Sequence, residues 1–137
     1  MRRVRVGVMA AAAMLVVAAM AAAHHSFFAE YDDKKPIKIT GKVIEMRWAN
    51  PHAWIYLEVE GKDGKPEKWA FETGAANSLY RRGWRKEDLP AGTVLTIDGW
   101  QARNGSNTVN ARSILLPDGR RLFAGTSNPN DASREQR

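Results

Sequence analysis

Apolar and polar residues alternate along most of the chain after residue 36, and this period of two predicts β-strands. The clearest stretch is HAWIYLEVE, residues 52–60. One of its faces is wholly apolar and consists of Ala53, Ile55, Leu57 and Val59. We expect this face to point into the core, and the opposite face, which begins with His52, to point away from it.

The first predicted strand, PIKITGKVIEMRW over residues 36–48, changes its apolar face along its length. Its first half places Ile37, Ile39, Gly41 and Val43 on one side, and its second half continues with Ile44, Met46 and Trp48. A period of two that slips by one residue predicts a β-bulge near Val43. Such a bulge bends a long strand, so that the strand can serve two parts of a sheet.

Further segments also have strand patterns, and turn sequences separate them. PEKWAFET, residues 66–73, predicts the third strand and follows the turn GKDGK. GTVLTIDGWQAR (92–103) and NTVNARSILL (107–116) predict two more strands, joined through the hairpin sequence Asn104-Gly105. RLFAG, residues 121–125, predicts a short sixth strand.

Residues 74–90 lack the period of two, and Leu79, Tyr80 and Trp84 fit a short helix that ends near Gly83. Three strands, a short helix and two strands follow one another in a five-stranded barrel of the OB type, with the helix between strands three and four. We therefore predict a mostly β fold, a small OB-like five-stranded barrel. A β-sandwich is the alternative, because the number of strands and the turn spacing fit both folds.

The barrel domain is expected over residues 36–124. Residues 24–35 have no clear period and predict an N-terminal arm, which Phe27, Phe28 and Tyr31 would dock onto the domain. Residues 125–137 are polar and predict a disordered tail.

The first 23 residues have the pattern of a secretory signal peptide. Arg2, Arg3 and Arg5 precede an uncharged, alanine-rich run from Val6 to Ala23, which ends in small residues. A membrane anchor and a twin-arginine signal are the alternatives. We expect cleavage, and therefore a periplasmic or secreted protein without a stable membrane anchor.

Cleavage of the signal peptide changes the electrostatic picture. The chain has a formal net charge of +6, and the loss of three signal-peptide arginines lowers it to +3. This charge does not indicate a nucleic-acid partner, and export disfavours one. Because the chain contains no cysteine, the domain has no disulfide and relies on a hydrophobic core, to which some of the five tryptophans would contribute.

Two adjacent histidines, His24 and His25, follow the expected cleavage site. Cleavage after Ala23 would let the α-amino group and imidazole of His24 chelate one metal ion, with His25 or His52 completing the nitrogen set. Cleavage after Ala21 would make His24 the third residue, an arrangement that suits square-planar Cu(II) or Ni(II). The histidines are thus a candidate Cu(II) site. Alternatively, they are solvated or pack locally in the arm.

The outward face of the second strand offers another candidate site. Aromatic side chains there would stack on a planar or anionic ligand that arginines hold; the candidates are Trp54, Tyr56, Trp100, Arg47 and Arg103. The partner would be an envelope protein or a small ligand, bound without metal. Alternatively, the arm or the helix covers this face, and His52 bonds a backbone carbonyl.

The sequence contains no nucleophile elbow, phosphate loop or HExxH zinc motif. Ser26 is near the histidine pair in the sequence, but adjacency alone does not make a catalytic triad. We therefore expect a binding module and not an enzyme. A copper oxidoreductase is the least favoured alternative.

The segments HHSFFAEYD, WANPHAWIYLEV, WAFETGAANSLYRRGW and ARNGSNTVNARSILLPDGRRLFAG together resemble a bacterial family of small exported proteins of unknown function. Mature chains of that family begin His-His-Ser-Phe and contain an Asn-Pro-His motif. The resemblance covers about residues 24 to 125. It implies export and a small β domain, and it supplies no activity, substrate or catalytic residue.

Overall fold

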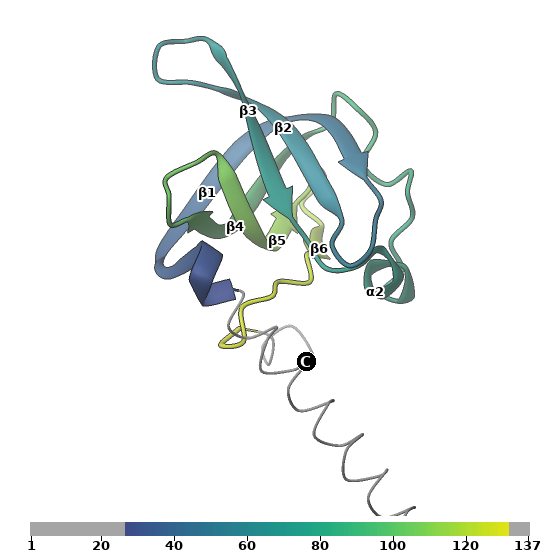
Figure 1. Cartoon of the computed structure of the whole chain (residues 1–137). Coiled ribbons are helices and arrows are strands. Elements are labelled where there is room, and N and C mark those ends of the chain that lie inside the picture. Colours follow the sequence, from purple (N-terminus) through teal and green to yellow (C-terminus); the bar gives the residue numbers. More distant parts are fainter. Residues whose placement is uncertain (1–26, 132–137) are drawn as a thin grey trace, which may run out of the picture.

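The structure is a computed structural model and describes residues 27–131 (Figure 1). Its elements in chain order are β1 (Tyr31–Arg47), β2 (Trp54–Glu60), β3 (Pro66–Glu72), α2 (Ala76–Arg81), β4 (Val94–Ala102), β5 (Thr108–Leu115) and β6 (Arg121–Phe123). A short helical turn over residues 27–30 precedes β1.

Hydrogen bonds join the strands into a closed ring. Antiparallel pairs connect β3, β2, β1, β4 and β5 in that order. The ring closes through a parallel pairing of residues 70–72 in β3 with residues 108–110 in β5. The helix α2 lies between β3 and β4 at one end of the ring (Figure 1). This arrangement is that of an OB-type barrel and confirms the predicted fold class.

The short strand β6 confirms the strand predicted from RLFAG. It pairs with residues 113–115 of β5, beyond the part of β5 that bonds β3. The chain therefore uses the second half of β5 to add a sixth strand beside the closed ring.

Strand β1 bends at the predicted bulge. Its pairing with β2 shifts between Val43 and Glu45, so Ile44 is the extra residue with no partner on β2. Val43 on one side of the bulge and Met46 and Trp48 on the other pack into the core, whereas Ile44 is exposed. The apolar face predicted for the second half of β1 therefore consists of Met46 and Trp48 without Ile44. Ile44 is the extra residue of the bulge, and its side chain is exposed.

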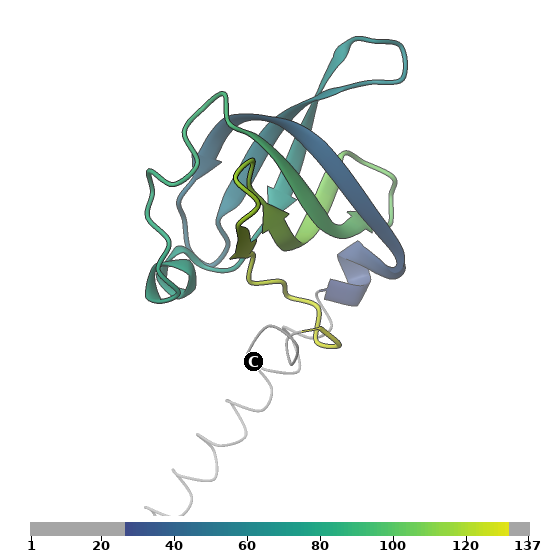
Figure 2. The same ribbon diagram turned by 180° about the vertical axis from the view of Figure 1, so that it is seen from behind.

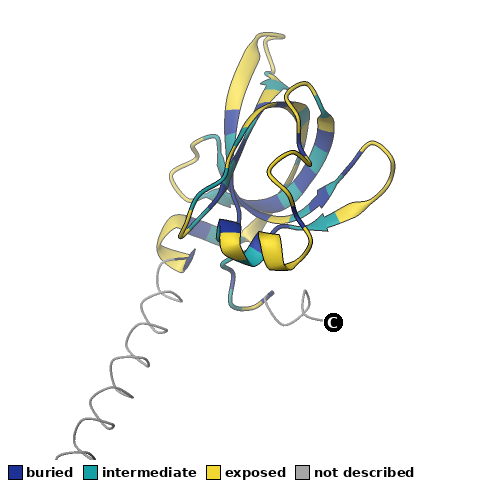
Figure 3. Cartoon of the chain, turned by 90° about the vertical axis from the view of Figure 1, so that its right-hand side faces the viewer, coloured by how far each residue is buried: buried dark blue, intermediate teal, exposed yellow. Residues whose placement is uncertain are grey.

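The core fills the inside of the ring, where the buried residues line the strands (Figure 3). Ile55 and Leu57 of β2 are fully buried, as their alternation predicted. Near α2, the side chains of Leu79 and Trp84 are also buried and close this end of the barrel. Tyr80, which the helix prediction grouped with them, is 57% exposed. Consecutive helical residues point about 100° apart, so Tyr80 faces away from the core.

The N-terminal arm docks through two of the three residues predicted to dock it. Phe27 and Tyr31 are buried and pack with Trp100, whereas Phe28 is exposed. The strand β1 also begins at Tyr31 and not at the predicted Pro36, so part of the predicted arm belongs to the sheet.

The C-terminal segment differs from the predicted disordered tail. Within residues 125–131, buried polar side chains pack on the outside of the barrel, namely Thr126, Asn128 and Asp131. Their polar composition suggested solvent exposure, but two of them find partners on β5: Thr126 Oγ1 donates to Asn110 Oδ1 at 2.6 Å, and Asp131 Oδ2 lies 2.7 Å from Arg112 Nε. Figure 2 shows this segment beside the N-terminal turn, and Asn130 Nδ2 donates to Asp33 Oδ2 at 3.3 Å.

Several sequence predictions lie outside the described residues. These are the signal peptide over residues 1–23, the adjoining residues 24–26 and the last part of the tail, residues 132–137. Among residues 27–131, no helix has the length and apolar character needed to cross a membrane.

Candidate functional site

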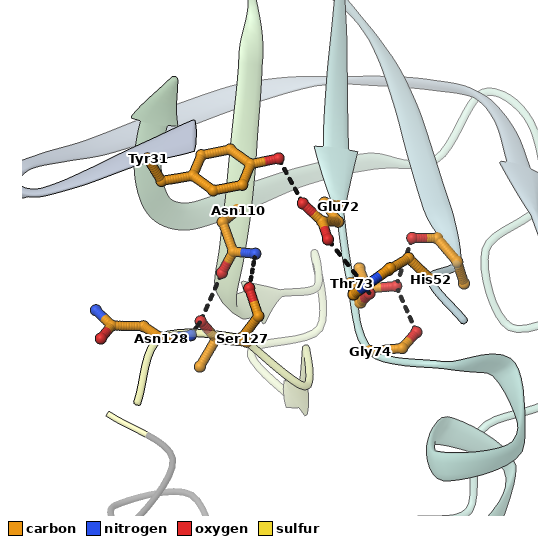
Figure 4. Close-up of polar contacts among 10 residues, drawn as sticks. Tyr31, His52, Glu72, Thr73, Gly74, Asn110, Ser127 and Asn128 are labelled. Atoms are coloured by element: carbon orange, nitrogen blue, oxygen red, sulfur yellow. Dashed lines mark hydrogen bonds and ion pairs between the residues drawn. The ribbon is translucent and has the colours of Figure 1, made fainter. Parts of the chain in front are cut away.

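Three polar side chains form a hydrogen-bonded chain across the outside of the barrel (Figure 4). Tyr31 comes from the start of β1, Glu72 from the end of β3, and His52 from the loop before β2. The Tyr31 hydroxyl donates to Glu72 Oε2 at 2.5 Å, and His52 Nδ1 lies 2.8 Å from Glu72 Oε1. Glu72 is only 7% exposed, and a buried carboxylate requires such partners.

Backbone hydrogen bonds fix the loop that carries His52. The Ala53 N–H donates to the Gly74 carbonyl at 3.1 Å, and the Thr73 N–H donates to the Ala53 carbonyl at 2.9 Å. The Thr73 hydroxyl donates to the same Ala53 carbonyl at 3.0 Å. Because these bonds tie the residue after His52 to the end of β3, the imidazole is held beside the carboxylate of Glu72.

The surroundings of His52 define which ring nitrogen carries the hydrogen. Nδ1 faces two acceptors, Glu72 Oε1 at 2.8 Å and the Thr73 carbonyl at 3.4 Å. Nδ1 must be protonated to donate to them, so the neutral imidazole has its lone pair on Nε2. Nε2 has no hydrogen-bond partner among residues 27–131, and the side chain is 42% exposed. The site therefore orients His52 through a carboxylate at Nδ1 and turns Nε2 away from that carboxylate.

The Tyr31 hydroxyl acts as the hydrogen-bond donor to Glu72. Burial raises the pKa of Tyr31 well above its ordinary value of 10.0, and the hydrogen bond and negative charge of Glu72 raise it further. Tyr31 therefore stays protonated near neutral pH. Its role is to hold the carboxylate that in turn holds His52.

The site lies over the parallel seam that closes the barrel. Asn110, a buried residue of β5, lies near Tyr31 in Figure 4 and accepts a hydrogen bond from Thr126 at 2.6 Å. The Asn110 amide also donates to Ser127 Oγ at 2.8 Å. The N-terminal and C-terminal segments thus meet here. Asn110, which contacts the C-terminal segment, pairs with Glu72 of the site in the β3–β5 ladder that closes the barrel.

Part of the predicted aromatic ligand face is assembled on β1 and β2. Arg47 pairs with Trp54 in register, and its guanidinium lies 5.3 Å from the centre of the Tyr56 ring. Lys68 on β3 places its ammonium 4.3 Å from the same ring. Two cations of the protein thus already contact Tyr56, and a ligand would have to compete with them for this ring.

The structure places Trp100 and Arg103, the other residues predicted for that face, at the N-terminal arm. Trp100 is buried, and the Phe27 ring packs edge-on against it with centroids 5.7 Å apart. Arg103 Nε donates to the Phe28 carbonyl at 2.7 Å. Both residues hold the arm, which covers this part of β4. The alternating pattern of β4 does not show that the arm covers this strand, because the arm itself has no periodic pattern.

The sequence pattern indicates His52 as a candidate ligand but does not indicate Glu72 as its partner. Glu72 ends β3 and lies opposite Trp54 in register, so alternation alone placed it on an outward face. The available signal was that Glu72 occupies an outward position at the end of the strand paired with β2, although His52 itself precedes β2 and does not begin it as predicted. The burial of Glu72 could not be inferred, because it depends on the arm and on Tyr31.

The described residues contribute one ligand to the predicted metal site. His52 is the only histidine within residues 27–131, and this part of the chain holds no group of three or more His, Asp or Glu side chains that could bind a metal ion. The other two predicted ligands, His24 and His25, lie outside the described residues. A metal site that includes His52 would therefore need further ligands from outside residues 27–131.

The fold and the site define a small OB-type β-barrel that carries a carboxylate-oriented histidine, and the same carboxylate is bonded to Tyr31 at the start of β1. The chain belongs to the family of unknown function DUF6152, which matches residues 11–111 and thus includes Tyr31, His52 and Glu72. No curated protein matches the chain. The family description carries no activity, so the function is argued from the site.

Proposed function

We propose that the mature protein is an exported binding module that holds Cu(II) between its processed N-terminus and His52. The observation that carries this proposal is the pairing of His52 Nδ1 with the buried carboxylate of Glu72, which leaves Nε2 available to a metal. Metal-binding histidines commonly donate their other ring hydrogen to a carboxylate in this way. That bond fixes the tautomer and makes the metal-binding nitrogen more basic.

The available ligands are nitrogen atoms, and this favours copper. His52, the two N-terminal histidines and the α-amino group would supply nitrogen donors, and the chain contains no cysteine to supply a thiolate. Divalent copper binds such donors more tightly than the other first-row divalent metals do. Calcium and magnesium prefer oxygen ligands, so they fit this set poorly.

The described part of the arm is connected to His52 through Tyr31 and Glu72. Phe27 is buried with its ring 5.6 Å from that of Tyr31, whose hydroxyl bonds the carboxylate that orients His52. His25 and His24 precede Phe27 by two and three residues, so a chain in extended form can carry them about 7 to 11 Å from it. The proposal requires the amine and imidazole of His24 to meet Nε2 of His52 within this reach.

A role for His52 as a copper ligand is compatible with only one of the two cleavage positions. After cleavage at Ala21, the amine, two backbone amides and the His24 imidazole would complete a square-planar set, and His52 would have no role. After cleavage at Ala23, the amine and imidazole of His24 would leave coordination positions for His52. We therefore propose cleavage after Ala23 and a periplasmic or secreted mature chain.

Binding suits this site better than hydrolysis. A nucleophilic mechanism needs a hydroxyl or thiol hydrogen-bonded to the base. Within the described range, no serine or threonine hydroxyl bonds His52, and Nδ1 faces acceptors only. We therefore propose a binding protein and not an enzyme, which agrees with the absence of catalytic motifs from the sequence.

The test is a Cu(II) titration of the mature protein, with the first residue verified as His24 by intact mass. Isothermal calorimetry and the d–d absorption band should report a single tightly bound ion. We expect His52→Ala to shift the band and to lower affinity at least tenfold, because a ligand is lost. Glu72→Gln should lower affinity about tenfold, as loss of a ligand's hydrogen-bond partner typically does. An extra N-terminal glycine should also weaken binding, because it displaces the amine.

Glu58→Gln is the matched control for Glu72→Gln. It removes the same charge from an exposed side chain whose ion-pair partner is Lys42 at 3.5 Å, and copper affinity should not change. If His52→Ala binds copper like the wild type, the metal belongs to the N-terminus alone and the role of His52 is disproved. If the wild type with His24 first binds no copper, the whole proposal fails.

A further inference from the structure

We infer that the open end of the barrel binds a small organic ammonium ion with an apolar body. A cavity of about 600 Å³, here called the mouth cavity, lies where the β2–β3 hairpin meets the connection from β4 to β5. Its volume falls within the range of small-molecule sites. The helix α2 follows the other end of β3, so the cavity and the helix lie at opposite ends of the barrel.

The floor of the mouth cavity is apolar. Ile37, Ile39, Val59 and Trp69 line it, and all of them pack against or within the barrel core. The Trp69 ring is buried, and it stacks on the Phe71 ring with the centroids 6.5 Å apart and the planes at 28°. Phe71 therefore supports the Trp69 ring on its core side. The floor therefore offers a preformed apolar surface that gains stability when an apolar ligand covers it.

The charge on the rim selects the kind of ligand. Three acidic residues line the cavity, together with one basic residue; they are Glu60, Asp63 and Glu67, and Lys62. Asp63 has a partner in Lys65, whose Nζ lies 3.4 Å away. Neither Glu60 nor Glu67 forms an ion pair with any residue in 27–131. The rim therefore attracts a cation and repels an anion.

Glu67 is held in a position to meet such a cation. Trp69 Nε1 and Asn107 Nδ2 each donate to Glu67 Oε2 at 3.2 Å. The other oxygen, Oε1, lies over Gly61, where an added Cβ would approach it to 2.8 Å. Oε1 accepts no hydrogen bond from the described part of the chain. An ammonium group at Oε1 would place its carbon atoms beside the apolar floor, because Trp69 bonds the same carboxylate.

The experiment is an NMR titration of ¹⁵N-labelled mature protein with hexylammonium, and with 1-hexanol and hexanoate as neutral and anionic probes of the same chain length. Hexylammonium should shift the Trp69 indole N–H and the amides of Val59 and Asn107 in a saturable way. It should bind about tenfold more tightly than hexanol, and hexanoate should bind most weakly.

Glu67→Gln should lower the affinity for hexylammonium about threefold or more and leave that for hexanol unchanged. Glu58→Gln removes the same charge outside the mouth cavity and should change neither affinity. Circular dichroism checks that both variants keep the fold, as expected for exposed side chains. Equal binding of the three probes, or shifts that avoid Trp69 and Val59, would overturn the proposal. Shifts at these residues that follow protein concentration without any probe would identify a second copy as the occupant and also overturn it.

Discussion

Replacing Tyr31 with phenylalanine tests whether the hydrogen bond from Tyr31 to Glu72 stabilises the attachment of the start of β1 to β3. The ring that packs with Phe27 and Trp100 is retained, and only the hydroxyl that donates to Glu72 Oε2 at 2.5 Å is removed. The carboxylate, which is 7% exposed, then keeps His52 on its other oxygen and loses its second partner. The substitution therefore isolates one hydrogen bond between the first strand and the third.

The size of the effect follows from the burial of this bond. A hydrogen bond to a charged group contributes about 1.5–3 kcal/mol to stability. We expect Tyr31→Phe to lower the free energy of unfolding by about 2 kcal/mol, which for a domain of this size lowers Tm by about 8 °C. Urea denaturation followed by tryptophan fluorescence measures the change.

The pH dependence provides a second signature. Because the pKa of Tyr31 in the folded state is raised above its ordinary value of 10.0, the unfolded chain loses this proton at lower pH than the folded chain does. Below about pH 10, the ordinary pKa of tyrosine, Tyr31 therefore makes its full contribution to the free energy of unfolding. Above that pH the contribution falls by about 1.4 kcal/mol per pH unit. The deficit of Tyr31→Phe relative to wild type should be largest near neutral pH and should shrink above about pH 10.

Tyr80→Phe is the matched control for this experiment. Tyr80 is 57% exposed, and its ring contacts the Arg85 guanidinium at 4.4 Å, so loss of its hydroxyl should change stability by less than about 0.5 kcal/mol. A Tyr31→Phe variant as stable as Tyr80→Phe would refute the role given to the Tyr31–Glu72 bond. A deficit that stays constant from about pH 8 to pH 11 would refute its assignment to a protonated tyrosine.

Other substitutions test the remaining contacts on the outside of the barrel. In Gly99→Ala, the new Cβ would lie 2.2 Å from the Asn110 carbonyl oxygen, so a loss of about 3 kcal/mol or failure to fold is expected; circular dichroism and soluble yield would show it, and a stable variant would contradict the close approach of β4 and β5. Phe27→Ala removes a buried ring and should cost about 3 kcal/mol in urea denaturation, with faster proteolysis of the arm; unchanged proteolysis would mean that Phe27 does not anchor it. Thr126→Val removes the hydroxyl that donates to Asn110 at 2.6 Å and should cost about 1–2 kcal/mol by the same assay, whereas no change would contradict the docking of the C-terminal segment.

The strands of the barrel could be predicted because a period of two is a local property of the sequence. The inward face of β2 follows directly from the alternation of Ile55 and Leu57, and the slip of that pattern in β1 located the bulge near Val43. Alternation did not show that Ile44 is the extra residue, since either neighbour of a bulge can turn outward. That choice depends on the register with β2.

The two ends of the domain could not be predicted in the same way. Phe27 and Thr126 lie in segments without a period, and each is buried by contact with a strand far away in the sequence. The composition of residues 125–131 resembles that of a solvated tail. Thr126 is nevertheless buried, because Asn110 on β5 accepts a hydrogen bond from its hydroxyl, and the Asn110 amide also donates to Ser127.

The candidate site was predicted in part for a related reason. His52 is recognisable because histidine is rare in this chain and follows Asn50-Pro51 at the start of a strand. Glu72 acquires its role only when β1, β3 and the loop before β2 come together. Such a meeting of three distant segments leaves no spacing in the sequence from which to infer it.

The most direct test of the copper proposal is the electron paramagnetic resonance spectrum of Cu(II) bound to the mature protein that begins at His24. The wild type should show nitrogen hyperfine coupling from the N-terminus and from the imidazole of His52. His52→Ala should lose the coupling of one nitrogen and change the copper hyperfine constant. Identical spectra for the two proteins would contradict a site shared between the N-terminus and the barrel.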